Sequence, residues 1–172
     1  CHKKPEASKS EMLAENKIDI RQMEVDDIPA VYRLGEKLFT STNFPTLYRT
    51  WDAYEVTEYF SSDPNYCLVA ELNDEIGGCE LATTIEKKGT AWNKYGYLAW
   101  ILVDEQYQGQ HIGKRFYRRL ETRWRKEGVR MVIVETSDKN HDAIAFFTAT
   151  GFAPTGKHVW LAKTLPRLRK KS

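Results

Sequence analysis

Residues 95–134 predict a strand, a helix and a second strand in direct succession, and this order limits the folds that the chain can adopt. The first segment, Tyr95 to Val103, is rich in aromatic and branched side chains, as β-strands are. From Ile112 to about Glu127, apolar side chains recur at every fourth position, which indicates a helix with one buried face. Residues Arg130 to Glu135 then predict a strand, in which the run from Met131 to Val134 is buried. A β-α-β order of this kind favours a sheet with helices packed on it.

The rest of the chain predicts further elements around this unit. We expect strands at residues 17–21, 66–72, 76–86 and 158–163, and helices at residues 26–39, 53–60 and 140–150. The early strands form a meander and should be antiparallel, whereas the later strands alternate with helices. The predicted fold is therefore α/β, a mixed, mostly antiparallel central sheet of six to seven strands with helices on both faces.

The length and charge of the chain indicate how many domains it contains and which partners are not favoured. The chain has 172 residues, 41% of them hydrophobic, which suits one domain with a full-sized core. We expect a disordered tail at 1–16, one folded domain at 17–165 and a basic C-terminal tail at 166–172. The net charge of +2 gives no global field that favours nucleic acid, and we expect no nucleic-acid partner. The predicted helix from Ile112 is strongly basic, which is typical of a solvated face.

Cysteine usage and hydropathy indicate a cytoplasmic protein without a metal. Cys1, Cys67 and Cys79 have no metal-ligand spacing. Cys67 and Cys79 stand in apolar, strand-like runs, so we expect them to be reduced core residues. No apolar run approaches the ~20 residues that span a bilayer, and no signal peptide is recognisable. We therefore expect no membrane partner.

The turn between the predicted strand and helix is the best candidate for a binding site. Gly109 and Gly113 allow the backbone to approach a ligand closely. The first amides of a helix have no intrahelical partner, and with the helix dipole they favour a phosphate or pyrophosphate. Lys114 and Arg115 add positive charge nearby. The sequence contains neither GxxxxGK[ST] nor GxGxxG, which argues against a P-loop or a Rossmann site.

Two motifs in this region resemble signatures of the GNAT superfamily of N-acetyltransferases. Gln108 to Gly113 resembles [QR]-x-x-G-x-[GA], and the preceding Val103 to Tyr107 is similar to V-x-P-x-[YF]. Further along, Asn140 to Phe152 resembles the second signature, N-x-x-A-x-x-[LF]-Y-x-x-x-G-F. Among the branches of the family, the motifs are most similar to those of ribosomal-protein alanine acetyltransferase-like members.

The resemblance implies acetyl-CoA as co-substrate, no metal, and a set of cofactor-binding residues. The backbones of Ile101, Leu102 and Val103 should bond the pantetheine arm as an added strand does. Asn140 should contact the pantetheine, cap a helix, or do both. Phe147 stands at the cofactor position of the second motif. The pyrophosphate should be held by the amides of Gly109, Gln110, His111, Ile112, Gly113 and Lys114.

The chain departs from the family pattern at two positions. His111 replaces the middle glycine, so a positive φ there would carry some cost and could alter cofactor affinity in either direction. Phe147 replaces the tyrosine that usually protonates the departing CoA thiolate. Phenylalanine cannot donate a proton, so another group or water must do so, or the step needs no acid.

Acetyl transfer to an amine also needs a base, because an ammonium with a pKa near ~10 is mostly protonated at neutral pH. Glu135, after the last buried strand, matches a glutamate that the alanine acetyltransferase branch uses as its base; otherwise it is a solvated strand-end carboxylate. Tyr97 matches a tyrosine that acts through water in some relatives, or else packs in the core. Glu80 is a third candidate, for which a structural role is favoured.

The resulting prediction is an N-acetyltransferase that moves acetyl from acetyl-CoA to a primary amine by direct attack in a ternary complex. In the family, the acceptor is gripped by regions that correspond here to residues 40–51 and 154–158. The first contains Phe44, Tyr48 and Trp51, an apolar wall suited to a protein or peptide amine, with a small amine as second choice. The alternative is a non-catalytic acyl-CoA-binding or sensing domain. We expect a monomer or a homodimer.

Overall fold

The computed structural model describes residues 17–40, 42, 51–91, 93–159 and 161–167. The chain divides into two compact units, Cys1–Ser137 and Asp138–Ser172, which are described separately below. The predicted N-terminal tail, Phe44, Tyr48 and residues 168–172 of the predicted basic tail lie outside the described residues.

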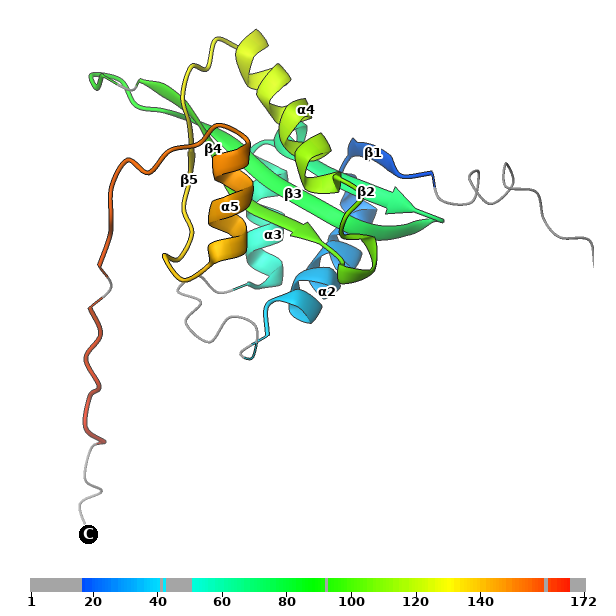
Figure 1. Cartoon of the computed structure of the whole chain (residues 1–172), viewed down its shortest axis with the longest axis horizontal. Helices are drawn as coiled ribbons and strands as arrows, with labels where there is room; N and C mark the ends of the chain where they lie inside the picture. Colours follow the sequence, from blue (N-terminus) through cyan, green and yellow to red (C-terminus); the bar gives the residue numbers. More distant parts are fainter. Residues whose placement is uncertain (1–16, 41, 43–50, 92, 160, 168–172) are drawn as a thin grey trace, which may run out of the picture. The chain divides into compact units, whose positions relative to one another are not determined.

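The first unit contains a five-stranded sheet in the order β1-β2-β3-β4-β5 (Figure 1). The strands are β1 (Asp19–Gln22), β2 (Cys67–Leu72), β3 (Glu75–Glu86), β4 (Lys94–Val103) and β5 (Val132–Val134). Each of β1 to β3 pairs antiparallel with the next strand, and β5 pairs parallel with β4. The prediction of a mixed, mostly antiparallel sheet is confirmed.

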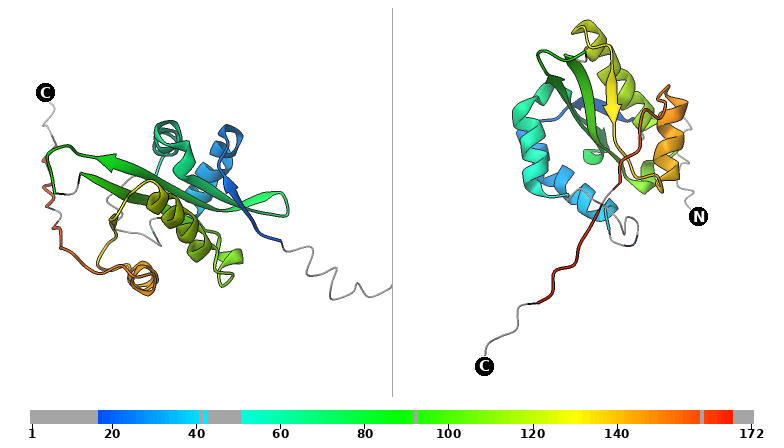
Figure 2. Two further views of the ribbon diagram at one scale, coloured as in Figure 1. Left: turned by 90° about the horizontal axis from the view of Figure 1, so that it is seen from above. Right: turned by 90° about the vertical axis from the view of Figure 1, so that its left-hand side faces the viewer.

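Helices cover both faces of this sheet, as predicted (Figure 2). On one face lie α2 (Ile28–Leu38) and α3 (Ala53–Ser62), and on the other lies α4 (Ile112–Lys126). Short 3-10 helices η1 (Val25–Asp27), η2 (Pro64–Tyr66) and η3 (Glu105–Tyr107) join these elements. No helix in the described part of the chain combines the length and the apolar character needed to cross a bilayer.

The core on the α2 and α3 face is apolar and contains both described cysteines. Cys67 and Cys79 are buried free thiols, and burial raises the pKa of Cys67 to about 12, so both are unreactive core residues as predicted. The buried cluster consists of Met23, Val31, Leu34, Val56, Cys67, Val69, Cys79, Leu81, Ala99, Trp100 and Leu102.

The opposite face is packed by α4 through large side chains that meet glycines of the sheet. A Cβ at Gly78 would lie 3.1 Å from the Phe116 ring, and one at Gly96 would lie 2.5 Å from the Trp124 ring. The Trp124 indole N–H also donates to Thr84 Oγ1 at 3.2 Å. The two glycines therefore allow α4 to approach β3 and β4 closely.

One predicted strand is absent. Residues His158–Lys163 were predicted to form a last strand, but the described residues of that segment form none, and the described sheet has five strands rather than six to seven. Val159 is 82% exposed and Leu161 is 91% exposed. A short apolar run is compatible with a strand, but a strand also needs a hydrogen-bonded neighbour, and none of the described residues of this segment has one.

The second unit contains α5 (His141–Ala149). Asn140 caps its start by accepting from the Ala143 N–H at 3.3 Å. Gly151, with a φ of 100°, follows its end, and the Phe152 N–H returns to the Phe147 carbonyl at 3.0 Å. The helix predicted at 140–150 is confirmed.

Candidate functional site

The candidate site of the first unit begins where β4 and β5 part. β5 pairs with β4 only from Gly96 to Leu98, whereas β4 continues to Val103. The register of β4 against β3 shifts opposite Leu81 and Ala82, so that Ala99 is an extra, bulged residue. Beyond this bulge, the side of β4 that faced β5 has no strand beside it among the described residues.

Two of the three predicted pantetheine-binding residues direct their backbones to this open side. The Asp104 N–H donates to the Gly77 carbonyl at 2.8 Å, which makes this pair a hydrogen-bonded one in the β3–β4 ladder. Bonded and non-bonded pairs alternate in antiparallel sheets. It follows that the N–H and C=O of Ile101 and Val103 point away from β3, whereas those of Leu102 pair with β3.

The turn after β4 brings several amides to the N-terminus of α4. η3 is followed by Gly109, with a φ of 82°, and by His111, with a φ of 58° and a ψ of 27°. Both residues are exposed and lie in the left-handed region, which is less costly for glycine than for histidine. His111 is the N-cap of α4, and its carbonyl accepts the Arg115 N–H at 3.0 Å. The positive φ anticipated at position 111 is thus present.

The amides of residues 109–114 form no hydrogen bond with any described residue. The Arg115 N–H is the first in α4 to find an intrahelical acceptor. Most of this segment is exposed, and Lys114 adds a cation. A run of open N–H groups at the positive end of a 15-residue helix can hold a phosphate or pyrophosphate.

Contacts that the sequence analysis missed hold this turn against the rest of the unit. Lys37, in the last turn of α2, bonds the Asp104 carboxylate at 2.7 Å. Asp104 also accepts the Gln106 N–H at 3.1 Å and so caps η3. Burial opposes ionisation of Asp104, but the hydrogen bonds from Lys37 and Gln106 outweigh it and lower the pKa of the carboxyl. The Tyr107 ring packs on Gly77, where a Cβ would lie 2.6 Å from it.

The two predicted proton-transfer residues lie on neighbouring strands. Tyr97 of β4 is opposite Ile133 of β5 and packs against the core on the α2 and α3 face. Glu135 follows β5 directly and is exposed. Because side chains alternate along a strand, Glu135 falls on the same face as Ile133 and Tyr97, where β4 and β5 separate.

Glu80, the third candidate base, is on the other face of the sheet. It is 0% exposed, and neither of its carboxyl oxygens has a hydrogen-bond partner among the described residues. Burial alone raises its pKa well above the usual value for glutamate. It is therefore a neutral core residue under α4 and cannot reach an acceptor beside Tyr97.

The remaining predicted residues belong to the second unit. Asn140 has the helix-capping role described above, which leaves its contact with pantetheine a prediction. Phe147 is 6% exposed and packs its ring against Phe146 and Phe152 at centroid distances of 5.1 and 5.3 Å. The described residues include no cluster of three or more His, Cys, Asp or Glu side chains suited to a metal.

Comparison with known proteins agrees with this geometry. Residues 30–152 match the model of the acetyltransferase (GNAT) family. N-acetyltransferase 8B of Homo sapiens is 27% identical over 137 residues, which cover 77% of this chain and 59% of that protein. The chain thus spans about three fifths of the length of that relative.

Solved structures share the fold at low sequence identity. The NatC complex bound to Gag peptide and CoA is similar with a TM-score of 0.68 and 15% identity, covering 81% of this chain and 87% of that one. The aminoglycoside N-acetyltransferase AAC(6')-Iy in complex with CoA has a TM-score of 0.67 and 19% identity, covering 86% and 95%.

Proposed function

Because the chain belongs to the acetyltransferase (GNAT) family, we propose that it moves the acetyl group of acetyl-CoA to a primary amine in a ternary complex. The observation that carries the proposal is the open turn of residues 109–114 beside the part of β4 beyond Leu98, where β5 no longer pairs with it. The amides of this turn would hold the pyrophosphate, and the Ile101 and Val103 backbones would hold the pantetheine.

The proposed chemistry needs a neutral amine next to a thioester. Acetyl-CoA supplies the acetyl group, whose C–S bond breaks as the C–N bond to the amine forms. Glu135 accepts the proton of the acceptor ammonium, directly or through a water that Tyr97 positions. Both residues fall on the face where β4 and β5 part, which suits a base beside pantetheine bound along β4. Phe147 supplies no proton, so water or another group protonates the departing thiolate, or the thiolate leaves without an acid.

The favoured acceptor is a protein or peptide amine. Near the start of the acceptor region, Phe39, Trp51 and Trp100 pack together with ring centroids 5.0 to 5.5 Å apart. Trp51 also donates to the Tyr32 carbonyl at 3.0 Å, which fixes it on α2. Phe39 and Trp51 are only partly buried against this core, and an apolar surface of this kind suits the side chains of a peptide. A small amine is the second choice, since one similar structure is of an aminoglycoside acetyltransferase.

A combined binding and turnover experiment tests this function. Acetyl-CoA should raise the Tm, and free thiol should appear only with an accepted amine from a panel of peptides, polyamines and aminoglycosides. Stabilisation without thiol release for any amine would favour the alternative, a non-catalytic acyl-CoA-binding domain, which His111 and Phe147 motivate. The absence of stabilisation would overturn both.

The role of Glu135 is tested by Glu135→Gln. We expect kcat at neutral pH to fall by about 100- to 10,000-fold, with acetyl-CoA binding nearly intact, because a general base contributes about that much. Glu75→Gln, an exposed glutamate at the start of β3, is the matched control and should keep full activity. A pH–rate profile that is the same in Glu135→Gln and wild type would remove Glu135 from the mechanism.

A further inference from the structure

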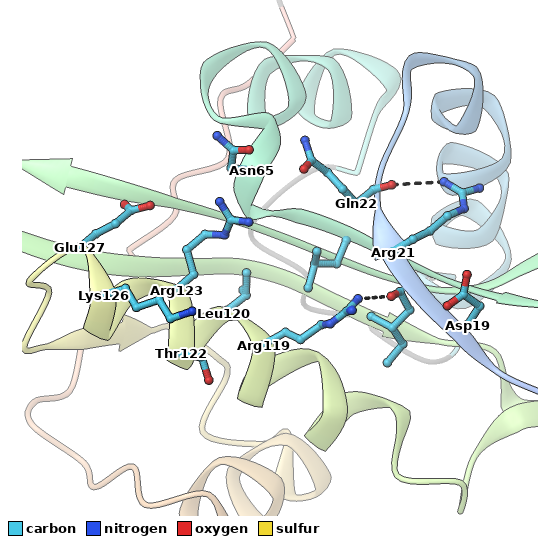
Figure 3. A pocket seen from close by; sticks show the side chains of 12 residues that line it. Asp19, Arg21, Gln22, Asn65, Arg119, Leu120, Thr122, Arg123, Lys126 and Glu127 are labelled. Carbon is cyan, nitrogen blue, oxygen red and sulfur yellow. Dashed lines mark hydrogen bonds between the residues drawn. The ribbon is translucent and has the colours of Figure 1, made fainter.

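A pocket of about 710 Å³ lies between β1 and the C-terminal half of α4. Buried Ile20, Leu68 and Leu120 are among its lining residues. Figure 3 shows Arg119 and Arg123 extending from α4 toward β1 and η2. A volume of this size is typical of small-molecule sites, which span about 300–1,000 Å³.

The charged groups that face this pocket leave an excess of cations. Arg21 is paired with Asp27 at 2.7 Å and with Glu71 at 2.8 Å. By contrast, Arg119, Arg123 and Lys126 form no ion pair within the described residues. The acidic groups of the lining are Asp19 and Glu127.

The hydrogen-bond donors of the pocket that form no ion pair are suited to binding an anion. The Glu127 carboxylate accepts the Tyr66 hydroxyl at 2.5 Å, and the Arg123 guanidinium lies over the Tyr66 ring, 5.9 Å from its centroid. This ring contact holds Arg123 in place and leaves its N–H groups available. Exposed Asn65 and Gln22 contribute amide groups to the same lining.

We propose that this β1–α4 pocket is an anion site for a small phosphorylated ligand, held by Arg123 and Lys126 with the Asn65 amide. It is distinct from the candidate pyrophosphate site at the other end of α4. With a rise of 1.5 Å per residue, Gly113 and Lys126 are about 20 Å apart along the helix, so one pyrophosphate cannot reach both. The proposal does not rest on acetyl transfer.

The test is an NMR titration with inorganic phosphate and pyrophosphate, in which the amides of residues 109–114 report separately on binding at the other end of α4. Sodium chloride at matched ionic strength is the salt control. We expect saturable shifts in the amides of residues 119–127 and Asn65, with pyrophosphate binding more tightly than phosphate. Arg123→Gln should weaken pyrophosphate binding by roughly tenfold or more, the loss expected for a charge-assisted hydrogen bond.

Two further variants make the result decisive. Lys126→Gln removes a side chain that forms no hydrogen bond or ion pair within the described residues, so it should weaken binding several-fold without loss of stability. Arg118→Gln removes an exposed charge of the same helix that does not line the pocket, and it should leave the affinity unchanged. Equal weakening by Arg118→Gln, or shifts that chloride reproduces, would overturn the proposal in favour of a diffuse positive field around α4. Tighter binding of a short oligoribonucleotide that depends on Arg118 would overturn it as well.

Discussion

Single residues set the chemistry of the proposed reaction, and Phe147 is the clearest departure from the family motif. Its ring is buried in the second unit, between Phe146 and Phe152. Phe147→Tyr adds the hydroxyl that the family signature carries. If protonation of the CoA thiolate limits turnover, kcat should rise by up to about 100-fold, as a general acid allows. Steady-state thiol release checks this, and an unchanged kcat would mean that the leaving thiolate needs no acid here.

A second residue-scale prediction concerns Glu80, whose buried carboxyl has no hydrogen-bond partner in the described part of the chain. Its pKa is raised by burial, so the folded chain favours the protonated form. Below the unfolded pKa of about 4.5, the carboxyl is protonated in both states and its burial costs least. As pH rises toward the raised pKa of the folded state, ionisation of the unfolded chain progressively lowers the stability of the protein. Glu80→Met should therefore stabilise the protein by about 1–3 kcal/mol at pH 8, or roughly 3–9 °C in Tm, and by much less at pH 5.

Thermal unfolding of Glu80→Met and wild type from pH 5 to pH 8 measures this difference. Glu75→Gln is the exposed control on the same strand and should follow wild type at every pH. A constant gap in Tm between Glu80→Met and wild type across that range would show that Glu80 does not change its protonation on folding.

At the scale of elements, the contact between α2 and the turn after β4 should control acetyl-CoA affinity. Lys37 is 54% exposed in its side chain, so solvent screening weakens its bond to Asp104. Lys37→Met should therefore raise the KM for acetyl-CoA up to about fivefold, with kcat nearly unchanged, because the turn would be less well ordered. Asp104→Asn keeps a capping side chain and should have a similar effect.

Asp104→Ala separates the two roles of this residue. It removes the cap of η3 as well as the ion pair, and a lost cap costs about 1 kcal/mol more. Its KM for acetyl-CoA should exceed that of Asp104→Asn by roughly fivefold. An equal fall in kcat for all three variants, with KM unchanged, would contradict a positioning role and indicate a general loss of folded enzyme.

The sequence predicted those elements whose patterns are local. β4 and α4 were placed to within a residue at each end, because apolar spacing and the glycines between them are local signals. The Lys37–Asp104 bond joins residues 67 apart, and no local pattern encodes it. The predicted strand at 158–163 was wrong because a short apolar run cannot supply a neighbouring strand. Glu80 could not be assigned to a face because its strand is buried on both sides.

At the scale of the whole molecule, arginines cover the open edge of the sheet at β1. The Met23 N–H donates to the Cys67 carbonyl at 2.9 Å, so by alternation the carbonyls of Ile18, Ile20 and Gln22 point outward from this edge. Arg115 donates to Ile18 at 3.3 Å, Arg119 donates to Ile20, and Arg21 donates to Gln22 at 3.2 Å. An edge strand whose acceptors are occupied cannot readily pair with another chain.

Removing these donors should change the oligomeric state. Arg115→Met and Arg119→Met together keep the apolar stems on α4 but leave two outward carbonyls of the β1 edge without a partner. We expect larger species that grow with protein concentration, because two β1 edges can then pair antiparallel. Light scattering coupled to size exclusion measures the mass. The control is Arg118→Met with Arg125→Met, which removes the same charge from α4 and leaves the edge covered, so its mass should match wild type. An equal increase in mass for both double variants would mean that charge on α4, rather than coverage of the edge, controls association, and a wild-type mass for both would contradict the prediction.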